Sequence, residues 1–312
     1  MITSLGDIVE QHAGSFPDKP ALIQEDAVWT YRDLRDLSRS AAQGFLAAGV
    51  HEQDRVAFLD RSAREYFPFL FGAGMINAVG LQGPGVEYWL HNLLPPLVEA
   101  GAAVVCSIWG RSVDDYARAA DMLAKAPSEV IAVEVNLSCP NLEGRGSIFA
   151  HDAALSAEVI DACSVAGRPL WAKLSPNTDR IVEVASAVVD AGADALTLVN
   201  TLLGLAIDPQ TRRPALGNGG GGLSGPPVHA VAVRAIADVH REMPAVPIIG
   251  VGGISTGWDA IEMMLVGASA VQVGTASFVD PRAPLRIATE MVRWARDNGV
   301  ERLGDLTGSA IR

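Results

Sequence analysis

From about Gly101 onward, apolar strand-like runs alternate six times with amphipathic helix-like runs. The strand candidates are apolar on both faces, which is typical of parallel strands covered by helices. Eight such units would close a (β/α)₈ barrel, so the pattern predicts an α/β chain with an incomplete TIM barrel. The strand candidates are Ala102–Ile108, Val130–Leu137, Pro169–Leu174, Ala195–Asn200, Val246–Val251 and Ala270–Val273. The helix candidates are Ser112–Lys125, Ala153–Val165, Thr178–Ala191, Val228–Glu242, Gly257–Val266 and Leu285–Asn298.

The first third of the chain has a different pattern and would have to supply the two missing units. It contains no obvious glycine-rich cofactor loop before Gly72. The elements expected there are helices at Leu5–Ala13, Tyr31–Ala48 and Ala63–Phe71, and strands at Pro20–Gln24 and Asp54–Leu59.

Charge and composition exclude several classes of protein. The formal net charge of −12 leaves no basic stripe for nucleic acid. No apolar run is long enough to span a bilayer, and the N-terminus lacks the pattern of a secretory signal. The three cysteines, Cys106, Cys139 and Cys163, have no paired spacing and are too few for an iron–sulfur cluster. We therefore expect a cytoplasmic protein.

The segment Asn136-Leu137-Ser138-Cys139-Pro140-Asn141 follows a predicted buried strand. It places a thiol between two carboxamides at the strand end where barrel enzymes carry their chemistry. A thiol can take a proton, and carboxamides can bind a planar substrate with C=O and N–H groups. The alternative is a small buried thiol next to a turn.

Further polar residues occur at other predicted strand ends. Lys173, one of three lysines in the chain, ends an apolar strand and could stabilise an anion formed on an electron-accepting ring. Asn200 and Thr201 end the next strand, and Asn77 lies in a predicted loop. The connection from Leu202 to Pro227 is rich in glycine, which permits close approach to a ligand or a mobile lid, or simply a flexible surface loop.

Two glycine-containing loops follow the last two predicted strands, at Gly252-Gly253 and Gly274-Thr275. In a TIM barrel such loops, opening onto helix N-termini, form the recurrent phosphate site. No His, Asp or Glu cluster has metal-ligand spacing, and no Walker or GxGxxG loop occurs. A thiol, four carboxamides, one lysine and a phosphate cradle fit FMN with a small planar amide substrate best.

With these motifs in this order, residues 73–312 resemble the dihydroorotate dehydrogenase family. In having a cysteine at position 139, the chain resembles the cytosolic class 1 enzymes of that family. The segments Val199–Pro214 and Gly221–Pro226 resemble the NAD-linked class 1B catalytic subunit. The motifs that carry the resemblance are NAVGL at Asn77–Leu81, NLSCPN at Asn136–Asn141, KLSPN at Lys173–Asn177, VNTLLGLAID at Val199–Asp208, GGLSG at Gly221–Gly225, IIGVGGI at Ile248–Ile254 and VQVGTA at Val271–Ala276.

The resemblance implies an FMN-dependent oxidoreductase of pyrimidine (UMP) biosynthesis that oxidises (S)-dihydroorotate to orotate. Cys139 would remove the C5 proton while hydride passes from C6 to FMN, and Lys173 would face the flavin N1/O2 edge. Because an unperturbed thiol is mostly protonated at neutral pH, activity should rise toward alkaline pH. The implied substrate-binding residues are Asn77, Ala78, Val79, Gly80, Leu81, Asn136, Asn141, Asn200 and Thr201. The implied cofactor-binding residues are Ser107, Asn136, Lys173, Val199, Gly225, Gly252, Gly253, Gly274 and Thr275.

The resemblance also implies partners: a second copy of the chain, and an electron-transfer subunit that carries FAD and the iron–sulfur cluster and reduces NAD. Two local departures from the family pattern are Ser107, where the family usually has an asparagine, and Gly83 in the loop after Leu81.

Residues 1–72 instead resemble the N-terminus of an acyl-CoA synthetase, an AMP-forming ligase, without its adenylation loop. The segments are Leu5–Ile23, Trp29–Val50 and Asp54–Gly72. We therefore expect two domains, 1–72 and 73–312. The dehydrogenase family fills this region with its first two barrel strands and a second lysine, but no lysine lies between Lys19 and Lys125 here.

Two alternatives to an active dehydrogenase remain open. One is a non-catalytic chimeric remnant that keeps the site residues but not a closed barrel, with two unpaired sheet edges. The other is a flavin barrel of the dihydropyrimidine dehydrogenase type, which would need a different residue set around Asn200.

Overall fold

The six predicted strands form one open parallel sheet. In this computed structural model, residues 13–24, 27–37, 56–57, 73–77, 84–138, 149–208, 211–217 and 219–311 are described. The sheet order is β5-β6-β7-β8-β13-β14, so strands adjacent in this repeat are also neighbours in space, and every pair is parallel. The strands are β5 (Val104–Ile108), β6 (Val130–Asn136), β7 (Leu170–Lys173), β8 (Ala195–Leu198), β13 (Ile248–Val251) and β14 (Ala270–Gln272).

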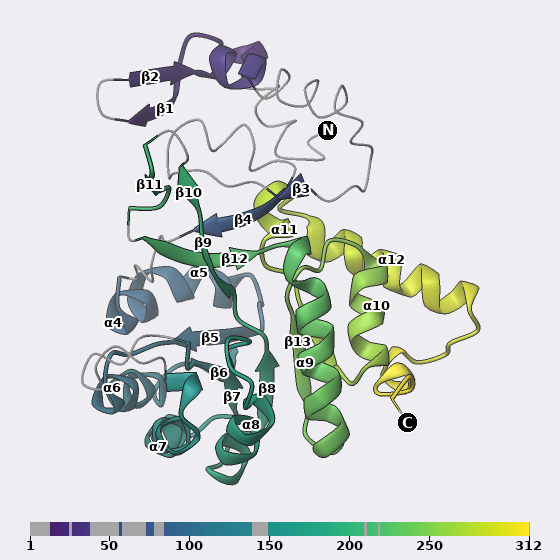
Figure 1. The fold of residues 1–312 in the computed structure, drawn as a ribbon. Coiled ribbons are helices and arrows are strands. Elements are labelled where there is room, and N and C mark those ends of the chain that lie inside the picture. The colour runs from purple at the N-terminus through teal and green to yellow at the C-terminus, as the bar shows by residue number, and fades with distance from the viewer. Residues whose placement is uncertain are drawn as a thin grey trace.

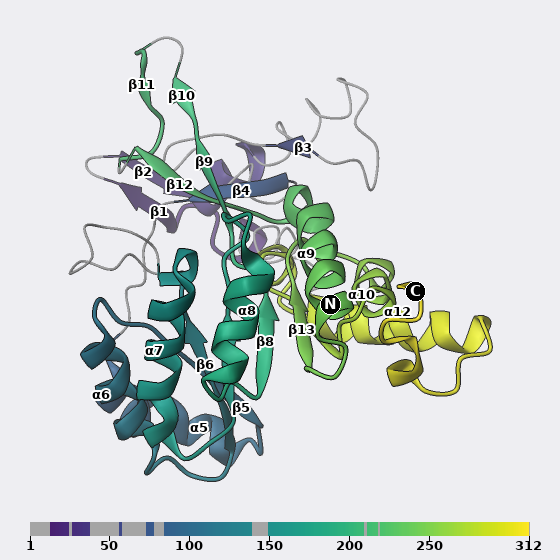
Figure 2. The same ribbon diagram turned by 60° about the horizontal axis from the view of Figure 1, so that its bottom comes forward.

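Helices connect these strands and pack against the sheet (Figures 1 and 2). All six predicted helices are present, with ends within three residues of the expected bounds. Nearly all residues of strands β6 and β8 are buried, as their apolar sequences indicate. The helices are α6 (Val113–Leu123), α7 (Ala153–Cys163), α8 (Ile181–Asp190), α9 (His229–Glu242), α10 (Gly257–Leu265) and α12 (Ala283–Asp297).

Local capping fixes where several helices begin. The side chains of Ser112, Asp152 and Thr256 each accept a hydrogen bond from the backbone N–H three residues later, at the start of α6, α7 and α10. The core between sheet and helices includes Tyr116 and Phe149, whose rings pack edge to face. These caps and this core hold the carboxyl ends of the strands in fixed positions.

Short helical elements complete this part of the chain. Residues 86–99 run through α4, η1 and α5 without a break before the first strand of the sheet. The short elements are α4 (Val86–Tyr88), η1 (Trp89–Leu93), α5 (Leu94–Glu99), η2 (Phe149–His151), η3 (Ser164–Ala166), η4 (Pro226–Val228), α11 (Ala276–Val279) and η5 (Leu303–Leu306).

A second sheet lies at the carboxyl end of the first, in the order β3-β4-β12-β9 (Figure 1). Its strands β9 and β12 lie in the glycine-rich connection from Leu202 to Pro227, so the interpretation of these two stretches as a flexible surface loop is wrong. The glycines serve close strand packing: a Cβ at Gly221 would lie 2.5 Å from the Asn77 carbonyl oxygen. The strands are β3 (Val56–Ala57), β4 (Ala73–Asn77), β9 (Leu202–Leu205) and β12 (Gly220–Ser224), with β10 (Ile207–Asp208) and β11 (Arg213–Pro214) pairing beyond β9.

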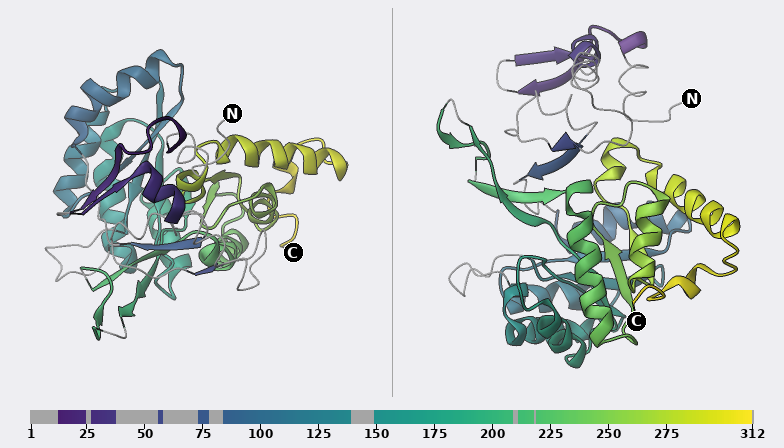
Figure 3. Two further views of the ribbon diagram at one scale, coloured as in Figure 1. Left: turned by 90° about the horizontal axis from the view of Figure 1, so that it is seen from above. Right: turned by 45° about the vertical axis from the view of Figure 1, so that its right-hand side comes forward.

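The first third of the chain contributes an antiparallel hairpin of β1 (Pro20–Gln24) and β2 (Ala27–Thr30), followed by helical residues 31–37. The hairpin lies apart from the six-stranded sheet in Figure 1 and in the right-hand view of Figure 3. The expected strand at Pro20–Gln24 is confirmed. The expected helices at Leu5–Ala13 and Tyr31–Ala48 are described only at 13–15 and 31–37, and the one at Ala63–Phe71 lies outside the described residues.

The expected strand at Asp54–Leu59 is described only as β3, which pairs with β4 and not with the six-stranded sheet. Within the described ranges, β5 and β14 are therefore the end strands of that sheet, which forms a half-barrel. Across the same residues, none of the helices combines the length and the apolar character that crossing a bilayer requires.

Candidate active site

A cavity of about 400 Å³ opens at the carboxyl ends of β7, β8, β13 and β14. Residues that follow four different strands line it, as expected at the functional edge of a parallel sheet. The cavity brings together nine residues that the sequence singled out. They are Lys173, Val199, Asn200, Thr201, Gly225, Gly252, Gly253, Gly274 and Thr275.

Two of the predicted carboxamides meet directly beside this cavity. The Nδ2 group of Asn200 donates to Oδ1 of Asn136 at 3.0 Å, although the two residues lie 64 positions apart in the chain. The same Oδ1 accepts from the Ser138 N–H at 3.2 Å. Asn136 ends β6 and Asn200 follows β8, so the fold joins their side chains across β7.

Lys173 is held by a carboxylate that sequence reasoning missed. Its Nζ lies 3.3 Å from Oε1 of Glu134, whose side chain is 5% exposed. Oε1 also accepts from the Ser107 hydroxyl at 3.1 Å, and Oε2 accepts from the Gln272 amide at 2.9 Å. Glu134 thus gathers donors from β5, β7 and β14. Ser107 does not line the cavity itself; its hydroxyl is directed to Glu134.

The two predicted glycine loops lie side by side on the cavity wall. Gly252 and Gly253 have φ angles of +134° and +71°, which side chains rarely adopt. Among the described residues, the backbone N–H groups of Gly253, Gly274 and Thr275 donate no hydrogen bond within the chain. Backbone donors without partners next to a cavity are suited to an anionic oxygen.

The N-terminus of α10, by contrast, is already occupied by the chain's own carboxylates. Oδ2 of Asp259 accepts from the N–H groups of Ser255 and Thr256 at 2.9 and 2.8 Å. Oε2 of Glu290, on α12, accepts from the Gly257 N–H at 2.6 Å. The loop after β13 does lead into α10, but two carboxylates already occupy the N–H groups at the start of that helix.

Asp259 keeps its charge through these bonds. Burial alone would raise the pKa of its carboxyl, but the N–H and hydroxyl donors of Ser255 and Thr256 outweigh burial and lower the pKa below the ordinary value of 3.8.

The two described cysteines show the opposite balance. Burial raises the pKa of Cys106 to about 11 and that of Cys163 to about 12.

Asn77 lies at the end of β4, opposite Gly222 in the register with β12. It therefore sits in the second sheet, close to Thr201, which packs against Gly222. Six predicted site residues lie outside the described residues: Ala78, Val79, Gly80, Leu81, Cys139 and Asn141.

Sequence reasoning missed three groups of this site: Glu134, the Ser255–Asp259 cap, and the pair Asp280 and Arg286, which line the cavity. One signal could have found the first, because Glu134 is the single charged residue in an otherwise apolar strand. A Thr-x-x-Asp cap was visible at Thr256–Asp259. Nothing in the sequence relates Arg286 to Ser255 in the loop before α10.

Known proteins resemble this chain over most of its length. The family model described as dihydroorotate dehydrogenase matches residues 68–294. The catalytic subunit of dihydroorotate dehydrogenase B (NAD(+)) from Pelobacter propionicus is 46% identical over 237 residues, covering 76% of this chain and 77% of that protein. A relative from Solibacter usitatus, named for the fumarate-linked dihydroorotate dehydrogenase A, is also 46% identical, over 76% of this chain and 78% of its own length.

The fold is also similar to a solved structure. The dihydroorotate dehydrogenase of Eimeria tenella, crystallised with ferulenol, superposes with a TM-score of 0.53 at 24% identity. The similarity covers 64% of this chain and 58% of that one.

Proposed function

The chain belongs to the dihydroorotate dehydrogenase family, and on that premise we propose that it oxidises (S)-dihydroorotate to orotate in pyrimidine biosynthesis, with FMN as its cofactor. The observation that carries this proposal is that nine residues from five separate sequence segments meet at one cavity. Its volume of about 400 Å³ is in the range of small-molecule sites.

The residues present fit FMN. The free N–H groups of the two glycine loops suit a phosphate, and Val199 and Gly225 give the apolar wall that a flavin ring needs. Lys173, held by Glu134, supplies a fixed cation on the same cavity. When bound, FMN would supply the acceptor for the hydride from C6 of the substrate.

The chain's own residues would orient the substrate and move its proton. The Sγ of Cys139 takes the proton from C5 of dihydroorotate. The carboxamides of Asn77, Asn136, Asn141 and Asn200, with Thr201 and the backbone of 78–81, bind the ring and its carboxylate. The Asn136–Asn200 hydrogen bond supports this role, because it fixes one carboxamide relative to the other.

We further propose that the catalytic unit spans 73–312, with 1–72 as a separate acyl-CoA-synthetase-like segment, and that the chain works as a homodimer. Its electrons would pass through an FAD and iron–sulfur subunit to NAD. The names of several relatives, which are catalytic subunits of an NAD-linked enzyme, support this partner. The name of the Solibacter relative refers to fumarate, so fumarate is the alternative electron acceptor to test.

A second candidate is a non-catalytic relative that keeps the site but not a closed barrel. It is favoured by the two end strands of the described sheet, β5 and β14, and by the position of β3 in another sheet. Such a protein would bind FMN weakly or not at all.

The test is the visible spectrum of the purified chain with added FMN. We expect a bound flavin that bleaches anaerobically with dihydroorotate but not with dihydrouracil. Cys139→Ser should slow bleaching by roughly 10²-fold or more. Cys163→Ser should not, because this thiol is buried at the C-terminal end of α7. A protein that stays colourless would favour the non-catalytic candidate, and bleaching by dihydrouracil would favour the dihydropyrimidine dehydrogenase type.

A further inference from the structure

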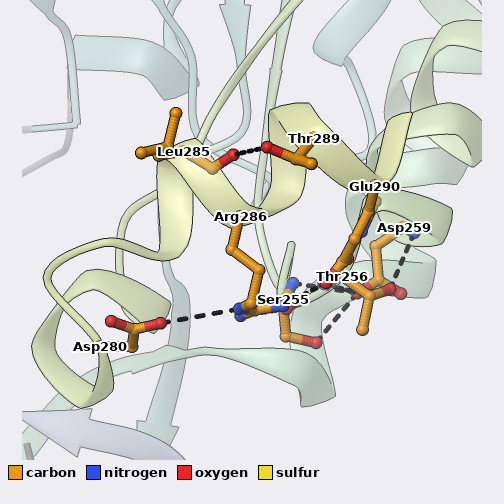
Figure 4. Close-up of polar contacts among 9 residues, drawn as sticks. Ser255, Thr256, Asp259, Asp280, Leu285, Arg286, Thr289 and Glu290 are labelled. Carbon is orange, nitrogen blue, oxygen red and sulfur yellow. Dashed lines mark hydrogen bonds and ion pairs between the residues drawn. The ribbon is translucent and has the colours of Figure 1, made fainter. Parts of the chain in front are cut away.

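Three charged side chains line the cavity: Lys173, Asp280 and Arg286. Lys173 extends from a strand of the sheet and is engaged by Glu134. Arg286 belongs to α12, outside the sheet, and reaches the loop between β13 and α10 (Figure 4). The cavity therefore has a second cation next to its glycine loops, which the proposed function does not use.

Arg286 is fixed on that loop by its neighbours. Its Nη2 donates to the Ser255 carbonyl oxygen at 3.0 Å, and its Nη1 donates to Oε1 of Glu290 at 2.9 Å. Its Nε lies 3.6 Å from Oδ2 of Asp280. A guanidinium carries five N–H donors, so these contacts leave donors for a ligand. The side chain is 42% exposed, which keeps it accessible from the cavity.

The charges around the loop make a cation necessary for any anion that binds there. Asp259 and Glu290 occupy the first N–H groups of α10 and its cap, and Asp280 lines the cavity itself. Three carboxylates would repel a phosphate dianion from the glycine N–H groups. Arg286 contacts two of these three carboxylates, Asp280 and Glu290, and it also donates a hydrogen bond to the loop itself at Ser255.

We propose that Arg286 is the residue that makes the cavity selective for a phosphorylated flavin. Resting on the proposed function, this assigns Arg286 a direct charge-assisted contact to the phosphate of FMN, made without releasing Ser255 or Glu290. The Asp280 carboxylate competes with the phosphate for the same guanidinium and so lowers the affinity for FMN. The ligand class is a phosphomonoester dianion attached to a flat aromatic ring.

Riboflavin tests this directly, because it carries the same ring without the phosphate. Quenching of flavin fluorescence gives the dissociation constants of FMN and riboflavin for the full chain. Arg286→Gln should weaken FMN about tenfold or more and leave riboflavin within about twofold. Arg286→Lys should recover part of the loss, and Asp280→Asn should tighten FMN.

Arg282→Gln is the matched control. Arg282 stands one turn earlier, carries the same charge and lies 3.9 Å from Asp280, but it does not line the cavity. We expect it to leave the ratio of riboflavin to FMN dissociation constants unchanged. Equal weakening of both flavins by Arg286→Gln would show a merely structural role and overturn the inference.

The outcomes separate the inference from the proposed function. A wild-type chain that binds neither flavin overturns both. A wild-type chain that binds FMN, with a ratio that Arg286→Gln does not change, overturns the role of Arg286 alone. An FMN-specific loss in Arg286→Gln, absent from Arg282→Gln, supports it.

Discussion

Glu134 and Asp259 are both buried carboxylates, and each holds a residue of the cavity wall in place. Asp259 binds Ser255 and Thr256, its neighbours within four positions of the chain. Glu134 binds Ser107, Lys173 and Gln272, which come from three other strands and lie up to 138 positions away. One carboxylate is satisfied by local backbone and hydroxyl donors, the other by side chains that only the complete sheet brings together.

This difference separates local from global determinants of the site. The Asp259 cluster needs only the first turn of α10, so it can form wherever that helix forms. The Glu134 cluster needs β5, β6, β7 and β14 in their final order. A change at Glu134 should therefore affect the whole sheet, whereas a change at Asp259 should affect one helix end.

The largest effect is expected at Glu134. Replacing it by leucine leaves the Lys173 ammonium, 19% exposed on the cavity wall, without its anion. Breaking a buried pair from one side costs about 3–5 kcal/mol of unfolding free energy. Urea denaturation of the flavin-free chain measures this loss.

The double variant Glu134→Leu with Lys173→Met is the control for that measurement, since it removes both charges. It should be clearly more stable than Glu134→Leu alone. If the two variants unfold at the same urea concentration, the cost arises from packing around Glu134 and not from the unpaired lysine.

A smaller effect is expected at Asp259. Removing the cap by Asp259→Ala should cost about 1–2 kcal/mol near neutral pH. The exposed pair of Glu183 with Arg180 offers a comparison, because Glu183→Ala should cost about 0.5 kcal/mol or less. Equal losses in the two variants would contradict a special role for the cap.

The Asp259 effect should also depend on pH in a defined direction. The pKa of this carboxyl is lower in the folded chain than its ordinary value of 3.8. Its contribution is therefore complete above that value and is lost as pH falls below it toward the folded pKa. The stability difference between wild type and Asp259→Ala should shrink below about pH 3.8, and a difference that grows there would contradict the shift.

The same division explains what the sequence predicts well. The six strands and their helices follow from apolar periodicity, and all are present close to their expected bounds. Strand ends then place Lys173, Asn200 and the glycine loops on one edge, because parallel strands share a direction. The meeting of Asn136 with Asn200 follows from the same rule.

What the sequence could not predict depends on tertiary contacts. The reach of Arg286 from α12 to Ser255, and the capping of Gly257 by Glu290, join segments about 30 positions apart across a helix interface. The glycine run at 220–222 does not look like a strand in sequence, because one of its partners, β4, lies about 145 positions earlier and the other, β9, lies in the same glycine-rich connection. Glycine there removes steric conflict, which no local pattern distinguishes from flexibility.

The smallest effect concerns the buried thiols of Cys106 and Cys163, at which no hydrogen-bond donor offsets the effect of burial on the pKa. Burial raises the pKa of the Cys106 thiol to about 11 and that of Cys163 to about 12, whereas the donors at Asp259 reverse the effect of burial there. Only the thiolate reacts with iodoacetamide, so both cysteines should stay unlabelled in the folded chain at about pH 8 and become labelled in urea.

A thiol alkylated under native conditions is then expected to be Cys139, and Cys139→Ser should abolish that labelling. Mass spectrometry of tryptic peptides locates the label. Rapid native labelling of Cys163 would contradict its burial. Labelling of Cys106 alone would locate the opening at β5, the end strand of the described sheet.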